Sequence, residues 1–233
     1  GEAEESCNKC HLPLIESSDF SARVRDDSGV TKTMDHLFPS ANMAVPTRAG
    51  AKGHVTAAQA QKAVEAHQAF NEGVLRVDIF GVREGGDIGG KLTAPLRPEV
   101  PALVPGQTYL LEVVVRTVKM GHTFTQGTTD SNQIWLDVNA TSGGAPVGAS
   151  GAMATDSGIV DPWAHYLNAF VLNREGQRIN RRNVHEIFTP LYSHQIPPGA
   201  ADTVHYRLDV PADASGSITV NVKLRYRKFD TEY

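Results

Sequence analysis

The two cysteines of this 233-residue chain lie three positions apart, in Cys7-Asn8-Lys9-Cys10-His11, and this segment constrains the fold more than any other feature. Such a pair can form a local disulfide, a redox Cys-x-x-Cys pair or half of a zinc site. A redox pair normally follows a strand of a thioredoxin-like unit, and nothing upstream of Cys7 can supply that strand. A structural zinc site needs four ligands, usually with a second cysteine pair, which this sequence lacks.

The spacing Cys-x-x-Cys-His is the attachment signature of a c-type haem. It lets two thiols reach two vinyl groups on one porphyrin edge while the next residue turns its imidazole onto the iron. We therefore predict one covalent haem c on Cys7 and Cys10, with His11 as the proximal iron ligand. Because such haems are attached outside the cytoplasm, we expect a periplasmic or extracellular protein. The sequence contains no signal peptide, so an exported form would be a processed or partial chain.

The distal iron ligand would come from the remaining histidines or the four methionines. Two histidines precede an aromatic residue in a turn-like context, His36 in Asp35-His36-Leu37-Phe38-Pro39 and His122 in Gly121-His122-Thr123-Phe124. Packed or surface roles are the alternative for each. We favour His36, because a ligand close to the motif closes a shorter loop at a lower entropic cost. His122 would instead be brought in by the folded domain that follows.

Composition changes along the chain and indicates three parts. Residues 1–55 show little periodicity and are predicted to be a loop-rich haem-binding segment. Residues 56–73 are predicted to be a short linking helix, with Thr56 as N-cap, Gln59 completing a capping box and Gly73 at the end. Residues 74–233 read as strands separated by Gly-rich and Pro-rich turns, which predicts a β-sandwich domain.

About seven strands with turn signals between them are typical of an antiparallel, immunoglobulin-like β-sandwich. Alternation is clearest at the end of the chain, where apolar residues recur at every second position between Ile218 and Tyr226. The fold class is therefore mainly β: a sandwich with a loop-rich N-terminal haem segment and one short helix. The predicted strands cover residues 74–82, 108–118, 133–138, 164–173, 203–210 and 217–228.

Several function classes are disfavoured by the sequence. A net charge of -4 and a pI near 6.1 leave no basic surface for nucleic acid. No apolar run approaches the roughly 18 residues of a transmembrane helix. The polar turn Thr129-Asp130-Ser131-Asn132 offers oxygen ligands for calcium, but a structural turn is the favoured interpretation.

An ordered series of motifs resembles the C-terminal region of bacterial multihaem cytochromes c. The series comprises Cys7-Asn8-Lys9-Cys10-His11, Asp35-His36-Leu37-Phe38-Pro39, Val77-Asp78-Ile79-Phe80, Gly121-His122-Thr123-Phe124 and Asp130-Ser131-Asn132-Gln133-Ile134-Trp135-Leu136. In that group a β-domain follows the last haem motifs. The resemblance implies electron transfer between haems, with His36 and His122 as distal ligands. Relatives carry several haem motifs and this chain carries one, so one of the two histidines could ligate a haem on a neighbouring chain.

The leading hypothesis is an electron-transfer cytochrome with a six-coordinate, bis-histidine haem, not an enzyme. Since a single haem needs a redox centre nearby, we expect other haem-bearing chains or identical subunits as partners, in a homo-oligomer, a filament or a multihaem assembly. One alternative is a haem enzyme with an open iron position, such as a peroxidase or a reductase of small molecules. Another is a binding or scaffold module in which the haem only staples the sandwich.

Overall fold

The chain divides into two compact units, Gly1–Glu72 and Gly73–Tyr233. The structure is a computed structural model that describes residues 7–127 and 129–233. The first six residues of the predicted haem-binding segment lie outside the described residues.

The first unit contains more regular structure than the sequence predicted. Strand β3 lies between β1 and β2 in an antiparallel sheet, and Leu14 pairs with Met34. Two further helices, α1 and α2, precede the one that the sequence predicted. The elements are α1 (Cys7–His11), β1 (Leu14–Glu16), β2 (Arg23–Val24), β3 (Thr31–Met34), α2 (Ala44–Ala51) and α3 (Ala57–Asn71).

Helix α3 begins where the sequence predicted. The Thr56 side chain accepts a hydrogen bond from the backbone N–H of Gln59, and the Gln59 side chain accepts one from the backbone N–H of Thr56. These two bonds satisfy donors that a helix start otherwise leaves without partners. The capping box therefore fixes the start of the helix that carries His67 and Phe70.

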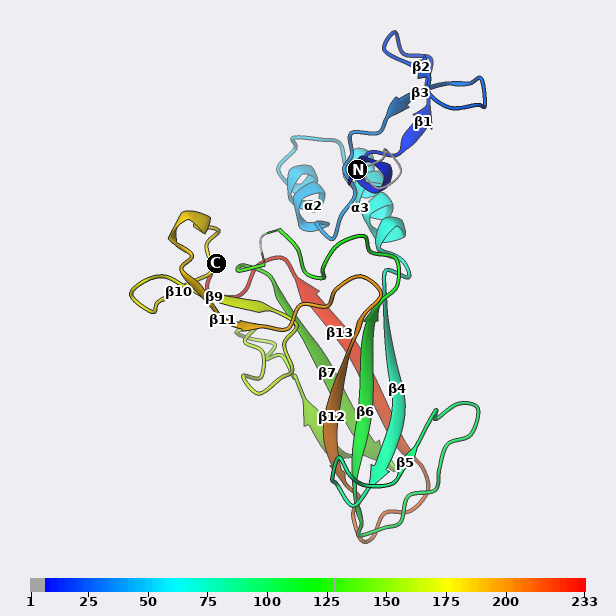
Figure 1. The fold of residues 1–233 in the computed structure, drawn as a ribbon, viewed down its shortest axis with the longest axis vertical. Coiled ribbons are helices and arrows are strands. Elements are labelled where there is room, and N and C mark those ends of the chain that lie inside the picture. Colours follow the sequence, from blue (N-terminus) through cyan, green and yellow to red (C-terminus); the bar gives the residue numbers. More distant parts are fainter. Residues whose placement is uncertain (1–6, 128) are drawn as a thin grey trace. The chain divides into compact units, whose positions relative to one another are not determined.

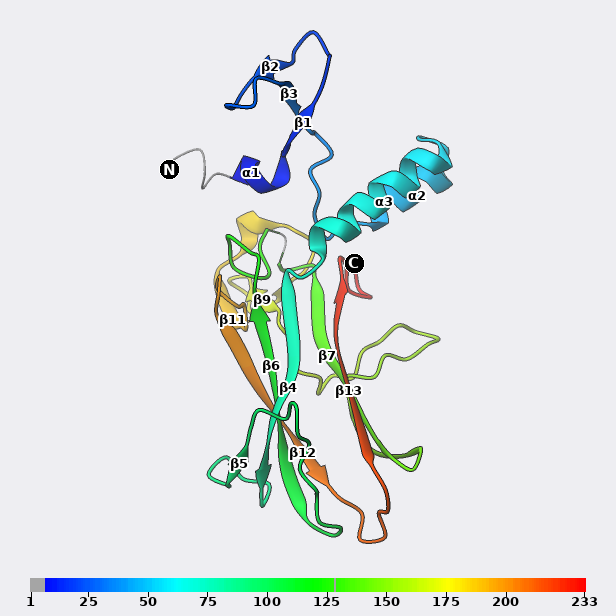
Figure 2. The same cartoon turned by 90° about the vertical axis from the view of Figure 1, so that its right-hand side faces the viewer.

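The second unit is a sandwich of two antiparallel sheets, drawn as two layers in Figures 1 and 2. One sheet has the order β12-β6-β4-β5 and the other β13-β7-β8. Their strands are β4 (Leu75–Glu84), β5 (Leu92–Thr93), β6 (Thr108–Thr117), β7 (Gln133–Ser142), β8 (Ala145–Ser150), β12 (Ala201–Asp209) and β13 (Ile218–Arg227). This confirms the predicted mainly β, antiparallel sandwich.

The main core lies between the two sheets. Alternate residues of β6 and β7 face inward, and partly buried residues of β13 pack against them. The predicted alternation of β13 is confirmed, because Val220, Val222 and Leu224 all point into this core. The fully or nearly fully buried members are Val113, Val115, Phe124, Ile134, Leu136, Val138, Leu167, Ile196 and Val204.

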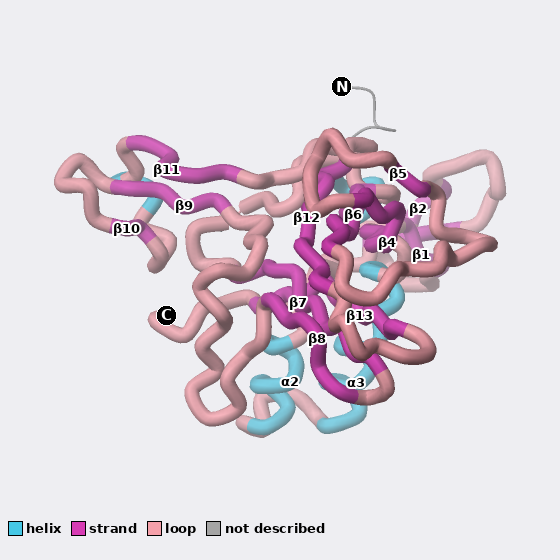
Figure 3. The backbone as a smooth tube through the Cα atoms, turned by 90° about the horizontal axis from the view of Figure 1, so that it is seen from below, coloured by secondary structure: helices cyan, strands magenta, loops and turns pink. Residues whose placement is uncertain are grey.

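A smaller sheet of order β10-β9-β11 extends to one side of the sandwich (Figure 3). It consists of β9 (Ala169–Leu172), β10 (Arg178–Ile179) and β11 (Thr189–Ser193), with the 3-10 helix η2 (Val184–Glu186) between β10 and β11. The strand predicted over residues 164–173 is regular only in its second half. Its first half joins β7 through an isolated bridge between Trp135 and Tyr166.

Candidate functional site

The haem-attachment motif forms the single helical turn α1, Cys7–His11. Residues three apart lie on the same helix face, so Cys7 and Cys10 present their thiols in one direction. Both thiols are exposed and neither is in a disulfide. This arrangement fits the covalent attachment of one porphyrin edge.

The imidazole of His11 is held by three contacts within the first unit. Its Nδ1 lies 2.8 Å from the carbonyl oxygen of Pro39. Its ring stacks on Phe38, with centroids 4.7 Å apart and planes 13° apart, and meets Phe70 of α3 at 5.2 Å. An imidazole that donates from Nδ1 carries its lone pair on Nε2, which is the usual arrangement of an iron-ligating histidine.

The segment after His36 connects this imidazole to helix α3. Phe38 has a φ of 51°, a left-handed conformation that costs energy for a residue other than glycine. Two residues on, the backbone nitrogen and carbonyl oxygen of Ser40 lie 2.8 and 2.9 Å from Nδ1 of His67. The Asn71 amide also donates to the Ser40 carbonyl, at 2.9 Å. His67 is only 6% exposed and joins this segment to helix α3.

His36, the favoured distal ligand, lies in an exposed turn of the same unit. The Asp35 carboxylate accepts the N–H of Leu37, and the Asp35 N–H donates to the carbonyl of Pro13. These bonds hold the turn and leave the side chain of His36 accessible to a group bound in this unit.

His122 belongs to the second unit and lies between β6 and β7. It is half-buried, and its Nδ1 is 3.1 Å from the carbonyl oxygen of Thr123. The neighbouring Phe124 is part of the sandwich core and exchanges backbone hydrogen bonds with Ile196. The two His-x-Phe segments therefore differ, because Phe38 contacts a candidate iron ligand whereas Phe124 supports the sandwich.

Several large apolar side chains of the first unit are exposed. Phe20 is 91% exposed and Phe38 51%, and Leu14, Ile15 and Leu37 are each more than one third exposed. The apolar side chains, the two thiols and the oriented imidazole suit a large apolar prosthetic group, and a haem fits this donor set.

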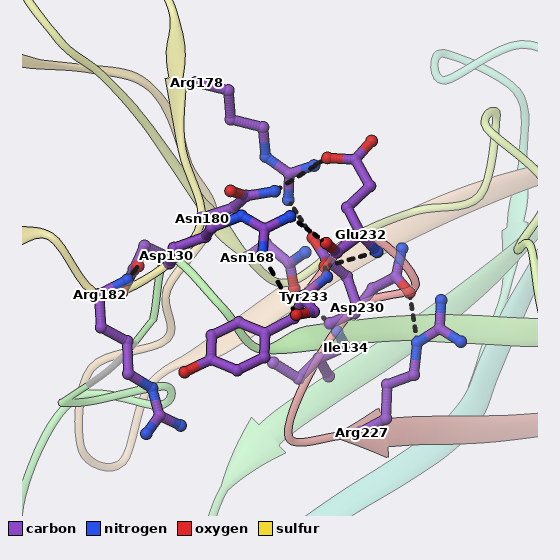
Figure 4. Close-up of polar contacts among 12 residues, drawn as sticks. Asp130, Ile134, Asn168, Arg178, Asn180, Arg182, Arg227, Asp230, Glu232 and Tyr233 are labelled. Carbon is purple, nitrogen blue, oxygen red and sulfur yellow. Dashed lines mark hydrogen bonds and ion pairs between the residues drawn. The ribbon is translucent and has the colours of Figure 1, made fainter.

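The turn weighed as a calcium site contributes instead to a network around the C-terminus (Figure 4). The carboxylate of Asp130 is buried and accepts the backbone N–H of Arg182 at 2.7 Å. Arg178 pairs with Asp230 at 2.9 Å, and Asn180 donates to the carboxylate of Glu232 at 2.8 Å. The Asp130 carboxylate is thus engaged in a hydrogen bond to the backbone of Arg182, and this contact gives the calcium interpretation no support.

Sequence reasoning missed a second cluster, His165, His194 and Asp202, whose potential ligand atoms lie within 4.8 Å of one another. The three residues come from the segment before β9, the segment after β11 and strand β12. Spacings of 29 and 8 residues match no metal motif, so no local signal could have identified the cluster.

Comparisons with known proteins give one informative match. No family model matches the chain, and no curated protein matches it. Among solved structures, the chain is similar to a penta-heme cytochrome c552 from Thermochromatium tepidum, with a TM-score of 0.50 and 15% sequence identity. The alignment covers 96% of this chain and 40% of the other, so the chain spans less than half the length of that cytochrome.

The fold of this chain is therefore similar to part of that cytochrome: a unit that carries the Cys-x-x-Cys-His segment, followed by a β-sandwich. The match in fold extends over both units of this chain. Within the part of the chain that the structure describes, no helix is long and apolar enough to cross a membrane.

Proposed function

We propose that this chain is a c-type cytochrome that transfers electrons outside the cytoplasm, with one haem attached to Cys7 and Cys10 and ligated by His11. The observation that carries the proposal is the fixed orientation of His11. Its Nδ1 is bonded to Pro39 and its ring is packed against Phe38, while both thiols stand exposed on the same helical turn. The match in fold to part of a multihaem cytochrome supports it.

A haem bound there would supply an iron centre that gains and loses one electron. The protein's own contribution is orientation and environment. By accepting a hydrogen bond from Nδ1 of His11, the Pro39 carbonyl would make the imidazole a more basic ligand for iron. Phe38 and Phe70 limit the rotation of the ring. The exposed apolar side chains of the first unit would exclude water from one bound group.

We propose His36 as the distal ligand of the same haem. It lies in the unit that carries the motif, and its side chain is exposed in the absence of a bound group. Two histidines would give a six-coordinate iron suited to electron transfer rather than to binding a substrate. His122 then remains for a haem on a neighbouring chain.

The test of the haem is the intact mass and reduced spectrum of the full chain, produced in a host that attaches c-type haems. We expect the mass of one haem and a low-spin spectrum without added ligand. A high-spin iron that binds carbon monoxide readily would favour the enzyme alternative. A chain that acquires no haem would contradict the proposal altogether.

The distal ligand is tested by the variants His36→Ala and His122→Ala, with His54→Ala as the matched control. His54 is also exposed and lies in the first unit, between α2 and α3. We expect a change to high spin in His36→Ala alone. A change in His122→Ala alone would reverse the assignment, and a change in neither would exclude both residues.

We further propose that the protein works in an assembly, either a homo-oligomer or filament or a complex with another haem-bearing chain. A single haem transfers electrons usefully only when another redox centre lies close. The measurement is the native mass of the protein in material purified from its own source. A monomer with no haem-bearing partner would contradict this part of the proposal.

A further inference from the structure

Three potential metal ligands from separate stretches of the second unit converge at one place. His165 precedes β9, His194 follows β11, and Asp202 is near the start of β12. Their ligand atoms all lie within 4.8 Å of one another. None of the three takes part in the proposed haem site, so their convergence calls for a separate explanation.

Two of the ligand atoms are in hydrogen-bonding contact, and all three lie within 4.8 Å of one another. Nε2 of His165 lies 2.7 Å from Oδ2 of Asp202, and the rings of His165 and His194 are stacked with centroids 5.3 Å apart. Ligands about 2.0–2.2 Å from a tetrahedral ion are roughly 3.3 Å from one another. Small rotations of the three side chains would therefore accommodate an ion between them.

Tyr192 orients His194 in the manner expected of a second coordination shell. The Tyr192 hydroxyl lies 2.5 Å from the carbonyl oxygen of Tyr166 and 2.8 Å from Nδ1 of His194. A carbonyl only accepts, so the single phenolic proton goes to Tyr166 and the phenolic oxygen accepts Nδ1–H of His194. This places the lone pair of His194 on Nε2, the atom left to coordinate a metal.

The three side chains thus offer two imidazoles and one carboxylate to an ion.

The backbone holds each ligand in place. The carbonyl of His165 accepts the N–H of Leu136 on β7, and the N–H of His194 donates to the carbonyl of Asn168. Asp202 pairs with Val115 in the register of β12 and β6. One side stays open, because His194 is exposed beside a hollow of about 230 Å³ that Gln195 and Asp202 also line.

We propose that His165, His194 and Asp202 bind one divalent first-row transition ion, of which Zn²⁺ is the probe, with water completing the coordination. Two imidazoles and one carboxylate suit such ions, whereas Ca²⁺ and Mg²⁺ prefer oxygen ligands alone. The ion would fasten the segments flanking the small sheet β10-β9-β11 to strand β12 of the sandwich. Binding to the folded state alone would stabilise this part of the protein.

The test is calorimetric titration of the chelator-treated full chain with Zn²⁺. We expect one site per chain, no binding heat with Mg²⁺ or Ca²⁺, and a higher unfolding temperature with Zn²⁺. The haem-loaded chain is used because its thiols are already consumed. If no haem attaches, the thiols are alkylated first, so failure of the haem proposal leaves this test intact.

The variants His165→Gln, His194→Gln and the nearly isosteric Asp202→Asn should each weaken Zn²⁺ binding about 100-fold or more. Tyr192→Phe, which removes the hydrogen bonds of the hydroxyl to His194 and to the Tyr166 carbonyl, should weaken it by about 10-fold. His185→Gln is the matched control, because His185 belongs to the same unit and its side chain is 80% exposed. The proposal would be overturned if the parent chain did not bind Zn²⁺. It would also be overturned if Asp202→Asn and His194→Gln bound Zn²⁺ as tightly as the parent chain.

Discussion

The imidazole of His11 lies nearly parallel to the ring of Phe38, at 4.7 Å between centroids, while Phe38 itself adopts a left-handed backbone conformation with φ of 51°. The backbone of Phe38 is therefore strained at the residue that supports the proposed proximal ligand. Such strain persists only where surrounding contacts compensate for it. Here the next two residues are both hydrogen-bonded, Pro39 to His11 and Ser40 to His67.

Replacing Phe38 should separate the contribution of the ring from that of the backbone. Phe38→Ala loses the ring stack, worth about 1 kcal/mol, and keeps the strained φ. Phe38→Gly loses the same stack but relieves about 1 kcal/mol of strain, so it should unfold at a higher temperature than Phe38→Ala. In the haem-loaded chain both variants should shift the reduction potential. Phe20→Ala, at a residue 91% exposed, is the control and should change neither quantity.

Glu112 is a buried acid of strand β6, with a side chain 7% exposed that lies 2.5 Å from Nε of Arg83 and 3.2 Å from Nε2 of His205. Burial alone would raise its pKa, but the hydrogen bonds from Arg83 and then His205 outweigh burial and lower it. The stability that this acid contributes is therefore present above its unfolded-state pKa and is lost as pH falls through the folded-state pKa.

Arg83→Met should lower the free energy of unfolding by about 3 kcal/mol at pH 7, because it leaves a buried carboxylate without its cation. The difference from the parent chain should be smaller at an acidic pH, below the lowered folded-state pKa of Glu112, because the acid is then protonated. Urea unfolding at the two pH values measures both effects. Arg76→Met is the control, since the exposed pair of Arg76 with Asp78 contributes at most about 1 kcal/mol. A pH-independent loss in Arg83→Met would contradict the assignment.

Asn168 is a fully buried amide whose Oδ1 accepts the backbone N–H of Ile134 at 2.8 Å (Figure 4). Asn168→Ala should cost about 1–3 kcal/mol, because it removes the acceptor of a buried donor. Asn221→Ala on the exposed face of β13 should stay within about 0.5 kcal/mol of the parent. Equal unfolding midpoints for the two variants would show that Asn168 is not needed to join β7 to the segment before β9.

The C-terminal tail depends on one ion pair more than on its other contacts. The Asp230 side chain is 4% exposed and pairs with Arg178, so Arg178→Gln leaves a buried carboxylate without its cation. We expect faster amide exchange over residues 230–233 and a stability loss of about 1–3 kcal/mol. Arg207→Gln removes a comparable but exposed pair with Asp209 and should leave the exchange of the tail unchanged.

Features encoded within a few residues were predictable from the sequence. Thr56 and Gln59 fix the start of α3 by themselves, and the alternation of β13 reports directly which residues face the core. The short turn at Gly143 and Gly144 was likewise predictable, because two residues join β7 to β8. In each case the cause lies within one segment and leaves a local pattern.

Features that depend on distant pairing were not predictable. Strands β1–β3 are short and exposed, so they carry no alternation, and β8 contains Pro146 and Gly148, which argue against a strand. Residues 164–168 were predicted to be part of a strand, but they pair with β7 only at the isolated bridge between Trp135 and Tyr166. The cluster of His165, His194 and Asp202 forms only when three separate segments have assembled, and the spacing of the three residues in the sequence does not indicate it.

The stretch from Phe38 to Ser40 has a consequence for how such chains can vary. Phe38 stacks on His11, and the Pro39 carbonyl accepts a hydrogen bond from Nδ1 of His11. Ser40 is hydrogen-bonded to His67 of α3. Three successive residues thus set the spacing between the proposed proximal ligand and a helix, and one inserted residue would break all three relations at once. We expect homologous chains to differ in length in the exposed turns around residues 26–29 and 52–55, and to keep this stretch free of insertions and deletions.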